Sequence, residues 1–382
     1  MISIQPAALR RVHKILGGYP LKKFYLICLF VIIFSATTSS AFIGERLLNQ
    51  AGLQTVWPSA IALNKGEKVA KITILGDYLY ILTDTNYLFC LDRSTGKLLF
   101  ATVLASPKFP VSAPSAYKDT VYFVAANKLI AFDIQQGTRL FETPLSMPVS
   151  AAIAANASNL YIPGMDKRLY ATDLNGQHII FQATADDVSL VTSVLADNDF
   201  VIFATDSGNV IRMSPLEPKR IWQFNAVGAV SAPLTSEANW IYASSRDTNL
   251  YKLENNSGRE MWRFRTGSVL TTSARAAQTA VYQYAINKGL YAIDADSGKQ
   301  IWLLPDGVDL LAQNGGTSYV FDKNNTCVIM DNAKAQKIGS VNFAPVTAYA
   351  SNTQDEMIYI MSGKNISCIR PAVKLLNKNK TE

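Results

Sequence analysis

The chain has 382 residues, of which 49% are apolar and 17% are charged, which is enough apolar material for a large buried core. The formal net charge of +7 does not indicate nucleic-acid binding, because the basic N-terminal leader contributes +5 and the C-terminal tail +2, which leaves zero for the residues between them. The only histidines are His13 and His178. Neither a His-based catalytic triad nor a zinc cluster is therefore expected.

Residues 1–44 form the predicted leader, in which the uncharged stretch 24–43 follows a basic start. Small polar residues end the stretch, and Ser39 and Ala41 are placed as a signal peptidase requires, which predicts a cleaved signal peptide. An uncleaved membrane anchor is the alternative, since 20 uncharged residues can just span a bilayer. Cys28 has bulky neighbours, so lipidation is not expected. Either way we expect export, with the rest of the chain periplasmic or anchored at the inner membrane outside the cytoplasm.

Residues 52–370 are predicted to contain eight repeats, each centred on a strand, a tight turn and a second strand, as in 289–302. The repeats follow one another at intervals of 37 to 41 residues, and a further β-rich run precedes each. Four strands in about 40 residues match one propeller blade. The first residues of the repeated motif are Leu88, Leu129, Leu169, Val210, Leu250, Leu290, Cys327 and Ile366.

An aromatic residue follows the end of the third strand at a constant distance of eight residues in six of the repeats. We expect these rings to dock each blade on its neighbour, because one face of a single blade cannot be buried alone. The predicted docking residues are Phe100, Phe141, Phe181, Trp222, Trp262 and Trp302. Repeat seven lacks both the aromatic residue and the turn glycine.

The eighth repeat ends soon after Ile366 without a fourth strand, while residues 54–60 form a β-like run around Trp57 that belongs to no repeat. The simplest arrangement is that this N-terminal run supplies the missing strand, with Trp57 as its docking residue. The sequence therefore predicts an all-β, eight-bladed β-propeller of four-stranded antiparallel blades, closed by an N-terminal strand. Residues 371–382 are predicted to be a basic tail.

The pattern AIDADSGKQIW at 292–302, with KLENNSGREMW and CLDRSTGKLLF, resembles the PQQ-like (quinoprotein-type) repeat family. Among exported propellers of this family, the chain is most similar to the BamB-type propellers of outer-membrane assembly. That resemblance implies a non-catalytic scaffold that binds other envelope proteins and needs no cofactor. The alternatives are a PQQ-dependent dehydrogenase-like quinoprotein and a ligand- or glycan-sensing envelope propeller. Dehydrogenases of the family carry a vicinal cysteine pair and a calcium site, and no residues of this chain correspond to either feature.

The turns between second and third strands share one face of a propeller, and six of the eight carry a positive charge. These residues form a candidate partner-binding rim for an acidic protein, with ordinary solvated turns as the alternative. The rim residues are Lys128, Lys167, Arg168, Arg246, Lys288, Lys323 and Lys364. Cys90 and Cys368 occupy equivalent positions in adjacent blades, so both unpaired thiols and a disulfide are possible.

Overall fold

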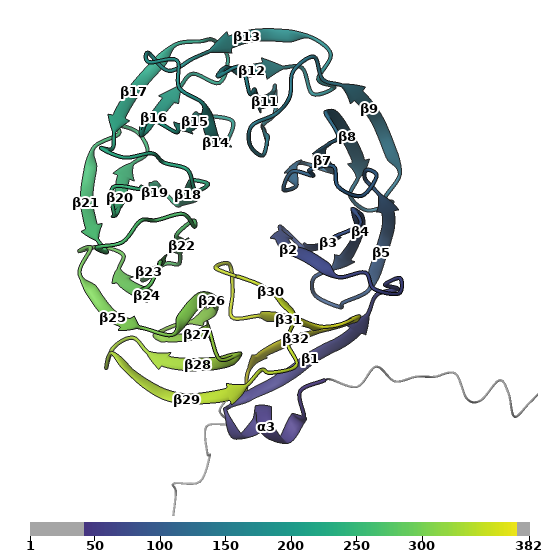
Figure 1. Ribbon diagram of the computed structural model, residues 1–382, viewed down its shortest axis with the longest axis vertical. Helices are drawn as coiled ribbons and strands as arrows, with labels where there is room; N and C mark the ends of the chain where they lie inside the picture. The colour runs from purple at the N-terminus through teal and green to yellow at the C-terminus, as the bar shows by residue number, and fades with distance from the viewer. Residues whose placement is uncertain (1–41, 373–382) are drawn as a thin grey trace, which may run out of the picture. The chain divides into compact units, whose positions relative to one another are not determined.

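The computed structural model describes residues 42–372, so nearly all of the predicted leader and tail lie outside the described residues. Eight four-stranded antiparallel sheets follow one another around a ring (Figure 1), which confirms the predicted eight-bladed propeller. In each sheet the first strand lies near the centre of the ring and the fourth at its perimeter.

Blades 1 to 4 each consist of four consecutive strands. They are β2 (Val69–Leu75), β3 (Tyr78–Thr83), β4 (Tyr87–Asp92) and β5 (Leu98–Val103); β6 (Ser115–Tyr117), β7 (Thr120–Ala125), β8 (Lys128–Asp133) and β9 (Arg139–Pro144); β10 (Ala154–Ala155), β11 (Leu160–Pro163), β12 (Leu169–Thr172) and β13 (Ile179–Ala183); β14 (Val191–Ala196), β15 (Val201–Thr205), β16 (Asn209–Met213) and β17 (Arg220–Asn225).

Blades 5 to 7 are built in the same way, and blade 8 combines the two ends of the described chain. The strands are β18 (Thr235–Glu237), β19 (Trp240–Ser244), β20 (Asn249–Glu254) and β21 (Glu260–Arg265); β22 (Arg275–Ala276), β23 (Ala280–Ala285), β24 (Gly289–Asp294) and β25 (Gln300–Leu304); β26 (Gly307–Asn314), β27 (Thr317–Asp322), β28 (Thr326–Asp331) and β29 (Gln336–Asn342); β30 (Ala348–Ala350), β31 (Ile358–Ser362), β32 (Asn365–Pro371) and β1 (Leu53–Ala60).

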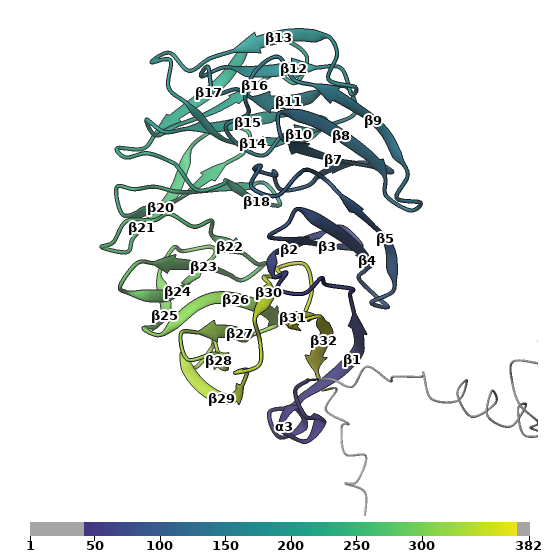
Figure 2. The same cartoon turned by 45° about the vertical axis from the view of Figure 1, so that its right-hand side comes forward.

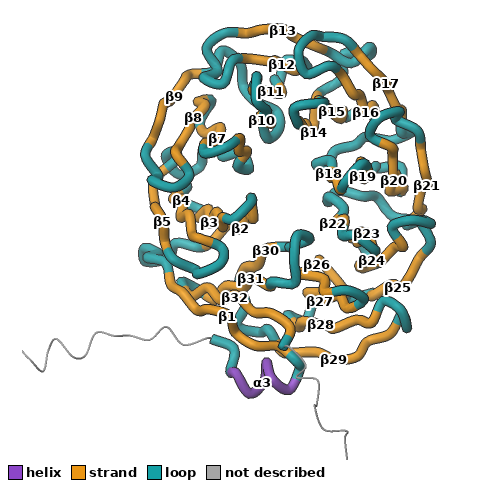
Figure 3. The backbone as a smooth tube through the Cα atoms, turned by 180° about the vertical axis from the view of Figure 1, so that it is seen from behind, coloured by secondary structure: helices purple, strands orange, loops and turns teal. Residues whose placement is uncertain are grey.

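The N-terminal strand closes the ring by pairing antiparallel with β32, so that Trp57 lies opposite Cys368. Figure 2 shows β1 alongside β32, although the two strands are separated by almost the whole described chain. Arg93 of blade 1 reinforces this closure: its Nε donates to the Tyr359 hydroxyl of blade 8 at 2.9 Å, and its guanidinium also pairs with Asp355. The short helix α3 (Glu45–Gln50) precedes β1 and buries Leu48 against blades 7 and 8 (Figure 3).

The repeated turns explain why the motif is regular. The carboxylate that ends the third strand accepts hydrogen bonds from the following turn, as Asp294 does from the backbone N–H of Ser297 at 2.7 Å. The turn glycines have positive φ, +70° at Gly96 and +69° at Gly298, a conformation that costs glycine little.

The predicted docking residues project from outer strands towards the next blade. Trp57, Trp222 and Trp262 donate their indole N–H groups to the carbonyls of Arg93, Asn255 and Ala295 at 3.2, 2.7 and 3.0 Å. Trp302 donates instead to the Asn332 side-chain oxygen at 2.8 Å. The rings of the three phenylalanines pack against buried clusters that span adjacent blades: Phe100, Phe141 and Phe181. The core is thus divided among the blade junctions.

Candidate interaction face

One face of the ring carries both the turns between second and third strands and the loops between blades; we call it the turn face. In most blades the same backbone hydrogen bond joins the two kinds of loop. The N–H of the first residue after the outer strand donates to a carbonyl in the turn between the second and third strands of that blade. Examples are Leu104 to Asn86 at 3.0 Å, Leu145 to Asn127 at 3.0 Å, Ala226 to Gly208 at 2.9 Å, Thr266 to Thr248 at 2.9 Å and Phe343 to Asn325 at 2.8 Å. The loops of this face are therefore tied to the blades.

All seven cations of the predicted rim are exposed on the turn face. Lys128 pairs with Glu142 at 2.6 Å, Arg168 lies 3.8 Å from Asp166, and Lys323 lies 4.0 Å from Asp306. The remaining cations, which form no ion pair with another described residue, are Lys167, Arg246, Lys288 and Lys364. The rim residues therefore lie on one face, but three of the seven lie next to carboxylates that offset their charge.

The acidic residues of these turns hold the neighbouring loops in place. Asp84 and Asp206 accept the backbone N–H groups of Lys68 and Leu190 at 3.0 and 2.8 Å. Asp247 accepts the N–H of Val227 at 3.1 Å and the hydroxyl of Tyr251 at 2.7 Å. Burial alone would raise the pKa of Asp247, but the hydrogen bonds from Tyr251 and Asn249 lower it. The sequence pattern predicted a role for the turn cations and none for these turn carboxylates.

An apolar groove of about 440 Å³ lies on the turn face between two proline-containing loops. One wall is 109–112, before blade 2, and the other is 148–152, before blade 3. Phe109 leaves 52% of its surface exposed there, and Met165 is exposed to the same extent beside the second loop, where its N–H donates to the Pro148 carbonyl at 2.8 Å. Apolar side chains displayed this way favour contact with another macromolecule.

Two turn asparagines, the buried Asn86 and the exposed Asn127, hold the loops beside this groove. The side-chain amide of Asn86 donates to the carbonyls of Ser106 and Phe109 at 3.0 and 2.9 Å. That of Asn127 donates to the Leu145 carbonyl at 2.8 Å. Both asparagines have positive φ, 63° and 62°, which Asn tolerates better than most residues. The sequence shows an Asn in each of these two turns, but it could not show which carbonyls they bind, because those carbonyls lie about 20 residues further along the chain.

Two further apolar side chains are exposed in the turn-face loops that precede blades 4 and 5. Val188 is 51% exposed and Val227 is 89% exposed. The loop at Val188 is held by Asp187, whose carboxylate accepts the Ser189 hydroxyl at 2.6 Å and the Asn209 amide at 3.0 Å. Hydrogen bonds from Ser189, then Ser207 and Asn209, lower the pKa of Asp187 to about 2. These apolar residues were not identified from the sequence, because a single valine in a loop carries no periodic signal.

A family model described as outer membrane protein assembly factor BamB matches this chain at 46–179, 107–224 and 206–344. The chain belongs to the BamB family. Together the three matches extend over most of the described blades.

Solved structures support the same fold. The crystal structure of BamB from Moraxella catarrhalis has a TM-score of 0.64 and 15% identity, covering 83% of this chain and 97% of that one. The computationally designed Ika8 protein has a TM-score of 0.60 and 14% identity, covering 79% and 96%. At such low identity these similarities show the fold alone. A search of curated protein sequences finds no match.

Membership of the BamB family does not by itself identify a reactive centre. Within residues 42–372, no three His, Cys, Asp or Glu side chains are grouped so that they could hold a metal ion. Cys90, Cys327 and Cys368 are free and buried, so the pair considered from the sequence is not a disulfide, and burial raises the pKa of Cys90 and Cys368 to about 12. No helix in the described part of the chain is long and apolar enough to cross a membrane.

Proposed function

We propose that this BamB-family propeller is an exported, non-catalytic scaffold that binds other proteins of the cell envelope through its turn face, as a component of outer-membrane protein assembly. The observation that supports this most directly is that the turn face carries an apolar groove at Phe109 and, in other loops of the same face, the exposed side chains of Met165, Val188 and Val227. Hydrogen bonds hold its loops before any partner binds, which lowers the entropic cost of association.

The rim cations support the same role. Lys167 lies in the same turn as Met165, and Arg246 lies next to Asp247, which holds the Val227 loop. Charges around an apolar centre affect association rate and partner choice more than affinity. A partner surface with apolar side chains surrounded by carboxylates would fit this arrangement.

The experiment is site-specific photo-crosslinking in cells that carry the native gene. A photoreactive amino acid replaces Phe109 or Val227 in separate strains, and replaces Ser94 or Asn256, on the opposite face, in matched controls. We expect the turn-face positions to yield a discrete crosslink to a protein of the outer-membrane assembly machinery. Equal labelling from both faces, or crosslinks only to unrelated proteins, would remove the proposal.

Amino-acid substitutions on the turn face provide a second test of this proposal. Val227→Asp should weaken copurification of the crosslinked partner without changing the thermal midpoint, because the side chain is already solvent-exposed. Reversal of Lys167 and Arg246 to Glu should slow capture, and the slowing should diminish at high salt. The alternative of a PQQ-dependent quinoprotein predicts a new absorbance band when PQQ and calcium are added to the purified protein.

A further inference from the structure

Two edges of β-sheet line the turn-face groove. Val111 forms an antiparallel bridge with Ala125 at the end of β7, on the same side of blade 2 as β6. Val149 forms one with Gly164 just after β11, on the same side of blade 3 as β10. This side lies nearest the ring centre and has no further strand of the blade beside it (Figure 1). An unpaired edge of this kind can accept another strand.

The hydrogen bonds of the Val149 bridge come from its neighbours. The N–H of Ser150 donates to the Pro163 carbonyl, and the N–H of Met165 donates to the Pro148 carbonyl, both at 2.8 Å. In antiparallel pairing, the residue between two such bonds directs its own N–H and C=O to the opposite side. Val149 therefore presents both backbone groups at the free edge, where neither bonds another described residue.

The equivalent valines of blades 4 and 5 are covered. Each begins a Val-Ser or Val-Thr pair at the end of an inter-blade loop, as Val149 does. The carbonyl of Val191 accepts the Ser150 hydroxyl at 2.7 Å, and that of Val230 accepts the Thr192 hydroxyl at 2.5 Å. Both valines are fully buried. In these blades the preceding blade thus occupies the free edge.

This series of hydroxyl contacts stops at the groove. The hydroxyl that would reach the Val149 carbonyl belongs to Ser112 of the preceding blade. It donates instead to the Ala113 carbonyl at 3.0 Å and accepts the Val124 N–H at 2.9 Å. Val149 is only half-buried, and it lines the groove. The groove therefore exposes a strand edge that is covered in the next two blades.

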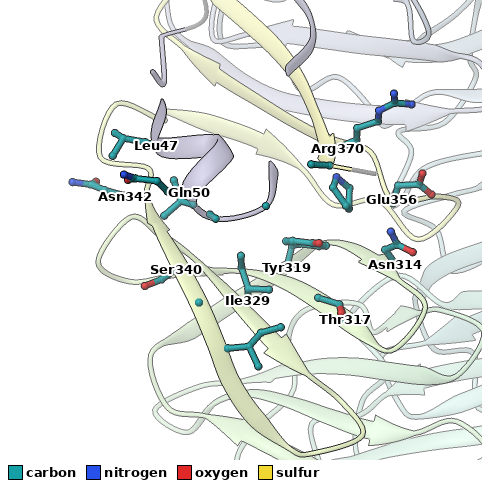
Figure 4. Close-up of a pocket in the computed structure, with 17 residues that line it drawn as sticks. Leu47, Gln50, Asn314, Thr317, Tyr319, Ile329, Ser340, Asn342, Glu356 and Arg370 are labelled. Atoms are coloured by element: carbon teal, nitrogen blue, oxygen red, sulfur yellow. The ribbon is translucent and has the colours of Figure 1, made fainter. Parts of the chain in front are cut away.

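The walls of the turn-face groove carry no charge. Its lining residues are apolar apart from two serines and one asparagine. The larger groove beside blade 7, where Gly339 takes the place of a docking ring, differs because Arg370 and Glu356 both line it (Figure 4). A charged side chain would lose its hydration in the turn-face groove without gaining an ion pair. These walls therefore favour uncharged, apolar side chains.

We propose that the turn-face groove binds an extended segment of a partner protein, which adds as a strand to the free edge of blade 3 and places uncharged apolar side chains against Phe109 and Pro110. A backbone N–H of the segment donates to the Val149 carbonyl, and a backbone carbonyl accepts the Val149 N–H. Such main-chain bonds provide affinity, and the alternate side chains provide specificity. Blade 3 is the receiving edge because the groove follows it over 148–152, where two successive alanines leave space. This inference rests on the proposed turn-face function and states what the partner presents there.

The test uses the full-length chain and a phage-displayed library of random eight-residue peptides. We expect the selected peptides to be apolar and uncharged in their central residues. The leading peptide is then methylated on one backbone nitrogen at a time. Affinity should fall at least about fivefold at alternate positions and change little between them, because every second N–H of an added strand faces the edge. Equal losses at all positions, or none, would overturn strand addition.

A pair of proline variants tests the receiving edge. Val149→Pro removes the free N–H without removing a hydrogen bond within blade 3, so it should weaken peptide binding at least about fivefold and leave the thermal midpoint unchanged. Val111→Pro is the matched control, since the sequence PVSA is the same at 110–113 and 148–151, and it should bind as the wild type does. A loss in Val111→Pro alone would overturn the assignment to blade 3. If either variant does not fold, the methylation pattern still decides.

Other outcomes separate this inference from the proposed function. A crosslink from Phe109 to an assembly protein, without alternation in the methylation series, would leave the turn-face function in place and overturn strand addition. Val227→Asp should leave peptide binding unchanged. Peptide binding that appears only after deletion of 1–41 or 373–382 would assign the groove to the chain's own ends, and self-association abolished by Val149→Pro would assign it to a second copy. Either result would overturn the proposal.

Discussion

The contact between Trp57 and Gly96 gives the sharpest test of how the ring is closed. A Cβ on Gly96 would lie 2.3 Å from Trp57 Cε3, and Gly96 has φ +70°. Gly96→Ala should therefore cost about 1–2 kcal/mol for the positive φ and about 1–3 kcal/mol for overpacking against the ring. Gly267 is the matched control: its φ is +72° and nothing lies within 4 Å of its Cβ position. Gly267→Ala should cost only the first of these two amounts.

A double-mutant cycle isolates the contact. Trp57 is buried and donates its indole N–H to the Arg93 carbonyl, so Trp57→Ala should cost about 3–5 kcal/mol. With the ring gone, Gly96→Ala should cost only about 1–2 kcal/mol. The double variant should therefore be less destabilised than the sum of the single variants by about 1–3 kcal/mol, a coupling of the size expected for residues in contact.

The assay is equilibrium unfolding in urea followed by far-ultraviolet circular dichroism, because indole fluorescence would itself change when Trp57 is removed. Equal costs for Gly96→Ala and Gly267→Ala would refute the tight-docking geometry. Strict additivity in the cycle would show that the two residues do not interact across the closure.

Three other predictions concern the loops and thiols. Asn86→Ala should destabilise the protein by about 1–3 kcal/mol through its lost hydrogen bonds and should speed hydrogen exchange at 104–112. Asn325→Ala is the matched control, because Asn325 also has positive φ, 53°, but has an exposed side chain that donates to no described group; it should cost only the backbone conformation and leave exchange at 104–112 unchanged. Unchanged exchange in Asn86→Ala would contradict the loop-holding role. Folding lowers the pKa of Asp187 to about 2, so the ionised carboxylate should stabilise the protein at pH values above its unfolded pKa of about 3.9 and lose that effect as the pH falls towards 2. The difference in unfolding midpoint between wild type and Asp187→Asn should therefore shrink over that range. A difference independent of pH would exclude this linkage. The three described cysteines are buried and should react with a thiol reagent only after unfolding, and rapid labelling of the native protein would show that their blades open.

The propeller could be predicted because its signals are local and repeated. A carboxylate, a glycine and an aromatic residue at similar spacing define most of the outer hairpins. The missing strand after Ile366 implied the closure by β1 that the structure confirms. The rim cations could be assigned to one face for the same reason. Their partners could not, since Glu142 and Asp306 come from a different strand and a different loop.

The turn-face groove and a second groove, of about 800 Å³ beside blade 7, depended on tertiary structure. The sequence showed that repeat seven lacks its aromatic residue, but whether this leaves a groove depends on how α3 and the two ends of blade 8 fill the space around Gly339. Likewise, Phe109 lines one wall of the turn-face groove and Met165, 56 positions later, bonds through its N–H to Pro148 in the other wall, because adjacent blades bring these loops together. Periodicity determined the blades and their order, because each strand and turn depends on a few neighbouring residues. The shape and exposure of the binding surfaces were decided by packing between segments remote in sequence, which no local pattern records.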